Sequence, residues 1–328
     1  MRPLERVLVR LSNWLGDALM ARPALHALRA AYPRAEITAC GPRVLLELLA
    51  SEGLWQRTEA LPGVPGLAAR LRDARFDAAL VLPPSFSSAW LAYRSGARLR
   101  VGFAHEGRSL LLTRAVRRPA RGDLHLSREY LRLAECLGAS EVPLPGLGVN
   151  EDAVREAGAL RARAGLEDRP FAILGPGAAY GPAKRWSLER FAALGLELAA
   201  RGLAVLVCGL ASERETCEDV AAAVGAQARS LAGVTSLPAQ AALCARAALT
   251  VSNDSGLAHL AAATGAPTVV VFGSTSSAWT APLGPCVRVV QRAPVCSPCF
   301  ARDCAIGYAC LAAVQVGMVT SAAGELVA

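Results

Sequence analysis

The stretch Phe171-Ala-Ile-Leu-Gly-Pro-Gly-Ala-Ala-Tyr-Gly-Pro-Ala-Lys-Arg-Trp186 joins an apolar run to a glycine-rich turn, and a helical pattern starts at Ser187. A strand, a glycine-rich loop and a helix N-terminus in this order can bind an anion. Lys184 in the loop is the one Lys among 35 basic residues. A compact ammonium suits a point contact to a phosphate oxygen. We predict that Lys184 binds phosphate; chance placement is the alternative.

Apolar runs alternate with helical patterns along the whole chain. We expect strands at 6–10, 36–40, 78–82, 171–174, 204–208, 248–251 and 268–272. We expect helices at 17–31 (kinked at Pro23), 43–50, 128–137, 187–201, 213–224, 238–246 and 256–263. This alternation, with strands rich in Val and Leu, predicts an α/β fold with parallel sheets covered on both faces.

Both halves repeat the pattern, which predicts two Rossmann-like domains, 1–160 and 161–328, with parallel sheets facing across a cleft. The boundary is expected near 148–168, and the final helix is expected to pack back on the N-terminal domain. Ligands of such folds bind beyond the carboxyl ends of the strands, and the cleft is the expected site.

The composition indicates a chain without a membrane span. Hydrophobic residues make up 53%, but no run of 18 apolar residues occurs. The first ten residues carry charges throughout and no apolar core of a signal peptide. We therefore expect a cytoplasmic location.

The net charge of +8 is concentrated in the first half. Residues 94–121 hold eight Arg and one acidic residue, Glu106. Such a segment favours an anionic partner: nucleic acid, anionic lipid or a phosphorylated substrate. A solvated Arg-rich face is the alternative. No nucleic-acid-binding module is recognisable and only 5% of residues are aromatic, so we predict no nucleic-acid partner.

Asp17 ends the segment Ser12-Asn-Trp-Leu-Gly-Asp17, directly after the first expected strand. It could serve as an ordinary N-cap. It could also be a carboxylate at the carboxyl edge of the sheet, kept ionised by the helix N-terminus and able to accept a proton from a hydroxyl.

A second helix start follows another strand in Val251-Ser-Asn-Asp-Ser-Gly-Leu-Ala-His259. Asp254, Ser255 and Gly256 form an anion-receptive turn, with a well-capped helix as the alternative. The second half of the chain thus has two helix N-termini that could bind anions, one of them next to Lys184, and together they could bind a diphosphate. His259 lies one turn further on and is either a packed core residue or a ligand contact.

An acid beyond the strand ending at Cys208 could accept hydrogen bonds from a ribose, and both Glu213 and Glu215 qualify; capping or surface roles are the alternatives. No Asp-x-Asp occurs, so Lys184 and helix N-termini would replace a metal at a diphosphate. The spacing Gly175-x-Gly177-x3-Gly181 is not the dinucleotide fingerprint, which gives little support to a dehydrogenase.

Three segments, 13–17, 176–186 and 252–259, resemble those of glycosyltransferase family 9, the ADP-heptose:lipopolysaccharide heptosyltransferases, and 181–186 is most similar to the heptosyltransferase II branch. Residues 82–88 and 298–304 extend the likeness over nearly the whole chain. The resemblance implies a GT-B fold and inverting, metal-independent transfer of heptose from ADP-L-glycero-D-manno-heptose, with no cofactor. The implied acceptor is heptosyl-Kdo-lipid A, an anionic inner core at the cytoplasmic membrane surface, and the implied location is peripheral on the inner face of that membrane.

The resemblance also implies roles for individual residues. Asp17 would be the base, Lys184 would contact the diphosphate, and Glu213 or Glu215 would bind the ribose. Other donor contacts would be Gly177, Arg185, Asp254, Ser255, Gly256 and His259. Acceptor contacts would be Asn13, Ser85, Arg94, Arg98, Arg100 and Arg108. Ala179 and Tyr180 depart from the small hydroxyl residues of other branches, so the donor is less firmly implied than the reaction class.

Four cysteines cluster at Cys296, Cys299, Cys304 and Cys310. Reduced structural thiols, a bound metal, and disulfide or redox chemistry are the alternatives. We expect the cluster to lie far from catalysis.

Two other functions fit the pattern less fully. A nucleotide-sugar epimerase on the same two-domain fold would need no acceptor. A non-catalytic protein that binds anionic glycolipid would be supported by the Arg-rich segment alone.

Overall fold

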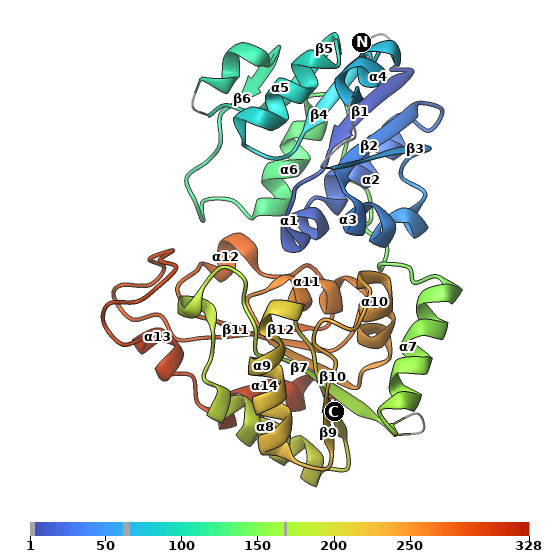
Figure 1. Ribbon diagram of the computed structural model, residues 1–328. Helices are drawn as coiled ribbons and strands as arrows, with labels where there is room; N and C mark the ends of the chain where they lie inside the picture. Colours follow the sequence, from blue (N-terminus) through green and yellow to red (C-terminus); the bar gives the residue numbers. More distant parts are fainter. Residues whose placement is uncertain (1–3, 62–65, 106, 167–168, 328) are drawn as a thin grey trace. The chain divides into compact units, whose positions relative to one another are not determined.

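The computed structural model describes residues 4–61, 66–105, 107–166 and 169–327 and forms two compact units, 1–145 and 146–328 (Figure 1). The division falls between residues 145 and 146, before helix α7 (Glu151–Arg163) and just ahead of the region 148–168 where we expected it. No helix in the described ranges is long and apolar enough to cross a membrane.

The N-terminal unit contains a six-stranded parallel sheet with helices packed around it. Its strands are β1 (Arg6–Arg10), β2 (Glu36–Pro42), β3 (Arg57–Leu61), β4 (Ala78–Val81), β5 (Leu99–Phe103) and β6 (Arg114–Val116). Its helices are α1 (Leu15–Met20), α2 (Arg22–Ala31), α3 (Arg43–Leu48), α4 (Leu67–Asp73), α5 (Phe86–Arg94) and α6 (Leu126–Glu135), with short 3₁₀ turns η1 (Ala50–Glu52) and η2 (Arg108–Leu111). The strand order is β3-β2-β1-β4-β5-β6.

The helix expected over 17–31 is two helices, α1 and α2, that meet at Ala21. Pro23 lies in the first turn of α2, where its missing N–H leaves no intrahelical bond unmade. Within one continuous helix, Pro23 would lack the N–H that bonds the carbonyl of Leu19. In place of the predicted kink at Pro23, the chain thus breaks into two helices just before this proline.

The C-terminal unit repeats the architecture in the order β12-β11-β10-β7-β8-β9. Its strands are β7 (Phe171–Gly175), β8 (Ala204–Val207), β9 (Ala228–Ser230), β10 (Leu249–Asn253), β11 (Thr268–Phe272) and β12 (Val287–Gln291). Helices besides α7 are α8 (Leu188–Ala200), α9 (Arg214–Val224), α10 (Leu237–Arg246), α11 (Gly256–Ala263), α12 (Ser277–Thr280), α13 (Ala309–Ala312) and α14 (Val316–Val327), with 3₁₀ turns η3 (Pro182–Lys184) and η4 (Ala211–Glu213).

The central strands of this sheet are buried on both faces, which explains the largely apolar sequences of β7 and β11, while β10 also buries Thr250, Ser252 and Asn253. In β7, Leu174 packs into a core with residues of α8, α9 and α14, while its neighbour Ile173 packs into a core with residues of α7 and α10. The final helix α14 packs against β11, β12 and α8 of its own unit, and its expected packing on the N-terminal unit stays a prediction.

Both strand orders reverse direction at one point, between β1 and β4 in the N-terminal unit and between β7 and β10 in the C-terminal unit. Loops that leave the carboxyl ends of such strands diverge and leave a crevice, where doubly wound sheets bind ligands. The segments that follow β1 and β4 hold Asp17 and Ser85, and those that follow β7 and β10 hold Lys184 and Asp254. The fold thus brings the predicted site segments together within each unit.

Candidate active site

Lys184 and Asp254 form an ion pair at the switch point of the C-terminal unit, with Nζ 2.6 Å from Oδ2. The Asp254 side chain is buried, and the Thr275 hydroxyl donates to the same oxygen at 2.6 Å. The Lys184 ammonium also lies over the Tyr180 ring, 5.1 Å from its centroid. This arrangement holds the ammonium in one place at the mouth of the switch point, where a phosphate can join it.

Asn253 fixes the loop that carries Lys184 at both ends. Its side-chain Nδ2 donates to the carbonyl of Pro176 at 2.7 Å, and its side-chain Oδ1 accepts a hydrogen bond from the backbone N–H of Trp186 at 2.9 Å. Trp186 is fully buried, and its indole N–H donates to the carbonyl of Val314. The loop is therefore clamped to the end of β10, so Lys184 has little freedom to leave Asp254.

Glu213 is pressed against the glycine loop, and this contact explains why residue 177 is glycine. A Cβ on Gly177 would lie 2.2 Å from the Glu213 carboxyl carbon. One carboxylate oxygen accepts the N–H of Leu210 at 2.9 Å, while Oε1 is buried without a hydrogen-bond partner among the described residues. A buried acceptor without a donor is unfavourable, so this oxygen is suited to a ligand hydroxyl. Glu215 is exposed in the first turn of α9.

The start of α11 lies beside the ion pair and has the form expected of an anion site. Ser255 is its N-cap, with extended backbone and no side-chain cap bond, and Gly256 is the first helical residue. The Ser255 hydroxyl lies 2.9 Å from that of Ser252. The first N–H groups of a helix have no partner within the helix and favour negative charge. His259 is buried one turn further on, as a packed histidine would be.

Arg185 and Tyr180 brace the loop. The Arg185 guanidinium donates to the carbonyl of Ala178 at 3.3 Å through both Nε and Nη2. The Tyr180 hydroxyl donates to the carbonyl of Phe300 at 2.6 Å, and the Arg302 Nε donates to the carbonyl of Tyr180 at 2.9 Å. Arg185 is thus hydrogen-bonded to the loop backbone in this structure, and the donor contact expected of it stays a prediction.

A pocket of about 350 Å³ lies at the switch point of the N-terminal unit. Four of the lining residues are ones that we predicted to be the catalytic base or to contact the acceptor: Asn13, Asp17, Ser85 and Arg108. The pocket is completed by Ser12, Trp14, Pro83, Pro84, Phe86 and His105. Three segments that are distant in sequence therefore converge around the Asp17 carboxylate.

Asp17 lies in the first turn of α1, but it is not the N-cap. That position belongs to Trp14, which makes no side-chain cap bond. The simple capping role considered for Asp17 is therefore wrong, and its carboxylate lines the pocket. Behind the loop, the buried Tyr130 hydroxyl lies 3.3 Å from the Ser12 hydroxyl. Burial, and next the negative charge of Asp17, raise the pKa of Tyr130, so its hydroxyl stays protonated.

Arg108 is the most unusual residue of this pocket because it is fully buried without an acidic partner among the described residues. Its Nη1 donates to the carbonyl of Pro83 at 2.6 Å, while Nε and Nη2 have no hydrogen-bond partner in the described structure. Burial lowers the pKa of the guanidinium to about 10, so the group is still charged at neutral pH. A buried cation with two free donors is suited to an anionic ligand group.

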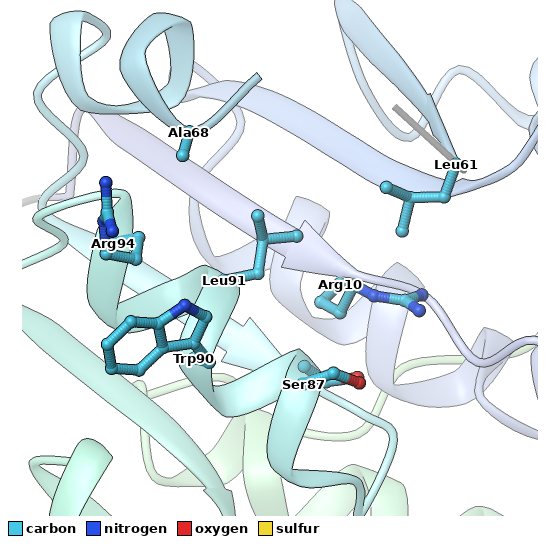
Figure 2. Close-up of a pocket in the computed structure, with 8 residues that line it drawn as sticks. Arg10, Leu61, Ala68, Ser87, Trp90, Leu91 and Arg94 are labelled. Atoms are coloured by element: carbon cyan, nitrogen blue, oxygen red, sulfur yellow. The ribbon is translucent and has the colours of Figure 1, made fainter. Parts of the chain in front are cut away.

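The other arginines predicted to bind an acceptor lie outside the pocket that contains Asp17. Arg98 is exposed, and Arg100 donates to the carbonyls of Leu111 and Ala97. Arg94 lines a second pocket of about 310 Å³, together with Arg10 and Trp90 (Figure 2). The structure thus separates the Arg-rich segment into one buried cation and several surface ones.

The cysteine cluster does not form a metal centre here. No group of three or more His, Cys, Asp or Glu side chains in the described part of the chain could hold a metal ion. Cys296 and Cys299 are exposed, whereas Cys310 is buried. All ten cysteines are free thiols, so the disulfide alternative finds no support in this structure.

Sequence reasoning did not single out Thr275, Asn253 or Tyr130. Thr275 stands in the polar run Gly273-Ser-Thr-Ser-Ser277 directly after β11, and a polar run after a buried strand could have indicated it. Asn253 is the last residue of β10, where the same signal applies. Tyr130 lies on α6, and its position behind Ser12 has no counterpart in the sequence pattern.

Comparisons with known proteins identify relatives of this chain by sequence and by fold. The model of a family described as glycosyltransferase family 9 (heptosyltransferase) matches residues 65–309. The lipopolysaccharide heptosyltransferase 2 of Escherichia coli K12 is 32% identical to this chain over an alignment that covers 92% of each.

Two solved structures share the fold over almost the whole chain. The E. coli ADP-heptose lipopolysaccharide heptosyltransferase II is 28% identical, with a TM-score of 0.83 and 98% of both chains covered. A family 9 glycosyltransferase from Veillonella parvula is 22% identical, with a TM-score of 0.85 and coverage of 98% of this chain and 97% of that one. Together with the two six-stranded parallel sheets, these similarities confirm the predicted GT-B fold.

Proposed function

Because this chain belongs to glycosyltransferase family 9, and is therefore an enzyme of the heptosyltransferase kind, we propose that it transfers heptose from ADP-heptose to the inner core of lipopolysaccharide. The acceptor in this proposal is heptosyl-Kdo-lipid A. The observation that carries it is the Lys184–Asp254 ion pair beside the start of α11, at the point where a doubly wound sheet binds its ligand.

The donor binds to the C-terminal unit in this proposal. Lys184 and the backbone N–H groups at Ser255 and Gly256 contact the diphosphate, because they supply the positive charge of the switch point. Asp254 holds Lys184 in place and can accept a hydrogen bond from the sugar. Glu213 accepts a ribose hydroxyl through its buried Oε1, which lacks a donor in the described structure. This favours Glu213 over the exposed Glu215 as the ribose-binding acid.

The acceptor binds to the pocket of the N-terminal unit. Arg108 contacts an anionic group of the inner core, because its two free donors have no other partner among the described residues. Asn13 and Ser85 contribute polar side chains to the same wall. The Asp17 carboxylate lines this pocket and takes the proton of the reacting hydroxyl.

The reaction in this proposal is a single displacement. The acceptor oxygen forms a bond to the anomeric carbon from the face opposite ADP, while the bond from that carbon to the diphosphate oxygen breaks. The hydroxyl proton moves to Asp17, and ADP leaves with the bonding electron pair. Lys184 and the start of α11 stabilise the charge that develops on the diphosphate. The new linkage has the opposite anomeric configuration to the donor.

No divalent metal is required in this scheme, because Lys184 supplies a cation at the diphosphate and the sequence has no Asp-x-Asp that would hold one. The test is a reaction of the purified enzyme with ADP-heptose and heptosyl-Kdo-lipid A in the presence of EDTA. Mass spectrometry should show one added heptose, and NMR should show the inverted linkage. A product with the donor's configuration, or activity that EDTA abolishes and Mg²⁺ restores, would contradict the scheme.

A further inference from the structure

Helix α5 carries its aromatic side chains on the solvent side. Phe86, Trp90 and Tyr93 follow one another at helical spacing, and their exposed fractions are 57%, 44% and 48%. The buried face of the helix is made of Ser88, Ala89 and Ala92. This distribution is the reverse of an ordinary surface helix, whose large apolar residues face the core.

The three rings form a continuous stack with arginines laid over it. Phe86 and Trp90 have ring centroids 6.5 Å apart, and Trp90 and Tyr93 have centroids 5.7 Å apart. The Arg94 guanidinium lies 5.8 Å from the Trp90 centroid, and that of Arg100 lies 5.5 Å from Tyr93. Rings that stack on one another leave no gap for a nucleobase to insert between them.

One further large apolar side chain is exposed on the element next to α5. Leu110 is 91% exposed on η2, which packs against α5. Exposed Arg98 lies between them in sequence and adds another cation. We name this surface the α5 face. It consists of Phe86, Trp90, Tyr93, Arg94, Arg98, Arg100 and Leu110.

An apolar groove opens beside the α5 face. It is the second pocket, of about 310 Å³, and it shares Trp90 and Arg94 with the face. Figure 2 shows Leu61 and Leu91 projecting into it, with Arg94 at one side of Trp90. The groove therefore pairs apolar walls with a cation at its rim.

Exposed aromatic rings, an aliphatic tip and several arginines match one environment, the interface of an anionic lipid bilayer. Trp and Tyr favour the headgroup level because one end is apolar and the other polar. Arginines near the surface are attracted to anionic lipids. A nucleic acid would leave Leu110 in water, whereas a bilayer would bury it.

We propose that the α5 face docks this protein on an anionic phospholipid bilayer. Trp90, Tyr93 and Leu110 enter the headgroup region, and Arg94 and Arg98 contact lipid phosphates. This gives the surface arginines a role apart from the Asp17 pocket, in which they do not lie. Its use in the cell rests on the proposed function, in which the acceptor is lipid-linked.

The test is co-sedimentation of the full chain with vesicles that contain no lipopolysaccharide. Vesicles of phosphatidylglycerol and phosphatidylcholine should bind the protein, and vesicles of phosphatidylcholine alone should bind it much more weakly. Arg94→Ser/Arg98→Ser should weaken binding roughly thirtyfold, because each basic residue near an anionic surface contributes about fivefold. Trp90→Ser/Tyr93→Ser should weaken it roughly tenfold or more.

A matched control changes an exposed Leu and an exposed Arg of the C-terminal unit, Leu196→Ser/Arg163→Ser, and should bind vesicles like the wild type. Equal binding by the α5-face variants and this control would overturn the proposal, as would a wild type that does not sediment with anionic vesicles.

A second readout separates docking from catalysis. With a lipid-free acceptor oligosaccharide, the α5-face variants should turn over like the wild type. Asp17→Asn should show the opposite pattern, with vesicle binding kept and turnover lost. Loss of activity on the lipid-free acceptor in both α5-face variants would place their residues in the acceptor site and contradict docking as their role.

Discussion

The Lys184 ammonium lies 2.6 Å from the buried Asp254 carboxylate, and this contact joins the segments that follow β7 and β10. The same Asp254 oxygen also accepts a hydrogen bond from the Thr275 hydroxyl. The loops that follow β7, β10 and β11 are therefore joined at this one oxygen. The pair places the sole lysine of the chain at the switch point of the sheet, where doubly wound folds bind their ligands.

Lys184→Ala should lower kcat by about 10²–10³, as expected when one charge-stabilising group is removed from a transition state. Lys184→Arg should not restore it, because the larger planar guanidinium cannot replace a point contact. Since the change leaves Asp254 buried without its cation, stability must be measured in parallel. Lys184→Met/Asp254→Asn is the control that removes both charges. Near-normal turnover of a folded Lys184→Ala enzyme would refute the role of Lys184.

Asp17→Asn should keep the affinity for ADP and lower turnover by about 10²–10⁴, the usual contribution of general base catalysis. The amide has nearly the same shape as the carboxylate but cannot accept the proton. Calorimetry with ADP and steady-state kinetics check the two halves of this prediction. If turnover survives the change, Asp17 is not the base.

Glu213→Ala should weaken ADP binding roughly 10–100-fold, because a hydrogen bond to a charged group is worth about 1.5–3 kcal/mol. Glu215→Ala is the matched control and should bind ADP like the wild type, since Glu215 is exposed. Isothermal titration of both variants decides between the two acids. Equal losses in both variants, or a loss in Glu215→Ala alone, would overturn the assignment.

Arg108→Met should stabilise the fold by about 1–3 kcal/mol at neutral pH while raising the KM for the acceptor roughly tenfold or more. Burial lowers the folded-state pKa of Arg108 to about 10, well below the ordinary value of an arginine, so burying the charged form opposes folding. This penalty is fully present below about pH 10 and declines as the pH rises towards that ordinary value. Urea unfolding and acceptor kinetics test the prediction. A destabilised variant with unchanged acceptor KM would show that Arg108 is structural.

A buried ion pair in the N-terminal unit should make folding sensitive to acid. Arg22 donates to Glu52 at 2.9 Å, and both side chains are almost fully buried. Burial, the largest effect, raises the pKa of Glu52, but the nearby His26 ring and the Arg22 guanidinium outweigh it, so the pKa is lowered overall. The resulting stability is therefore present above about pH 4.5 and is lost as the pH falls through the folded-state pKa.

Glu52→Gln should accordingly lower the free energy of unfolding by about 3–5 kcal/mol at pH 7, because it leaves Arg22 buried without a counter-charge. The difference from the wild type should shrink in acid. Urea denaturation at pH 7 and pH 4 measures both effects. A variant as stable as the wild type at pH 7 would show that the pair contributes nothing.

The parts of the fold that sequence predicted are the central strands. The runs that became β4, β7 and β11 are almost wholly apolar because both faces of these strands are buried, and β1 and β10 keep an apolar segment among polar residues. Residues directly after such strands must lie at the carboxyl edge of the sheet. For that reason Asp17, Lys184 and Asp254 could be selected from the sequence alone.

The missed elements carry no such signal. β3 (Arg57–Leu61) and β6 (Arg114–Val116) are partly exposed strands at the edges of their sheet, and their mixed sequences resemble loops. Arg108 stands among seven other arginines within 94–121, and charge pattern alone does not show that this one is buried. Helix α5 was missed because its aromatic residues face solvent, which removes the amphipathic pattern that indicates a helix.

The most direct test of the account is the rate of ADP release from ADP-heptose, with and without heptosyl-Kdo-lipid A. The account predicts release that depends on the acceptor and equals the heptose added to it. Turnover with another core glycan only would keep the reaction and correct the acceptor. Interconversion of the nucleotide sugar without any acceptor, or no ADP release with any acceptor, would contradict the account.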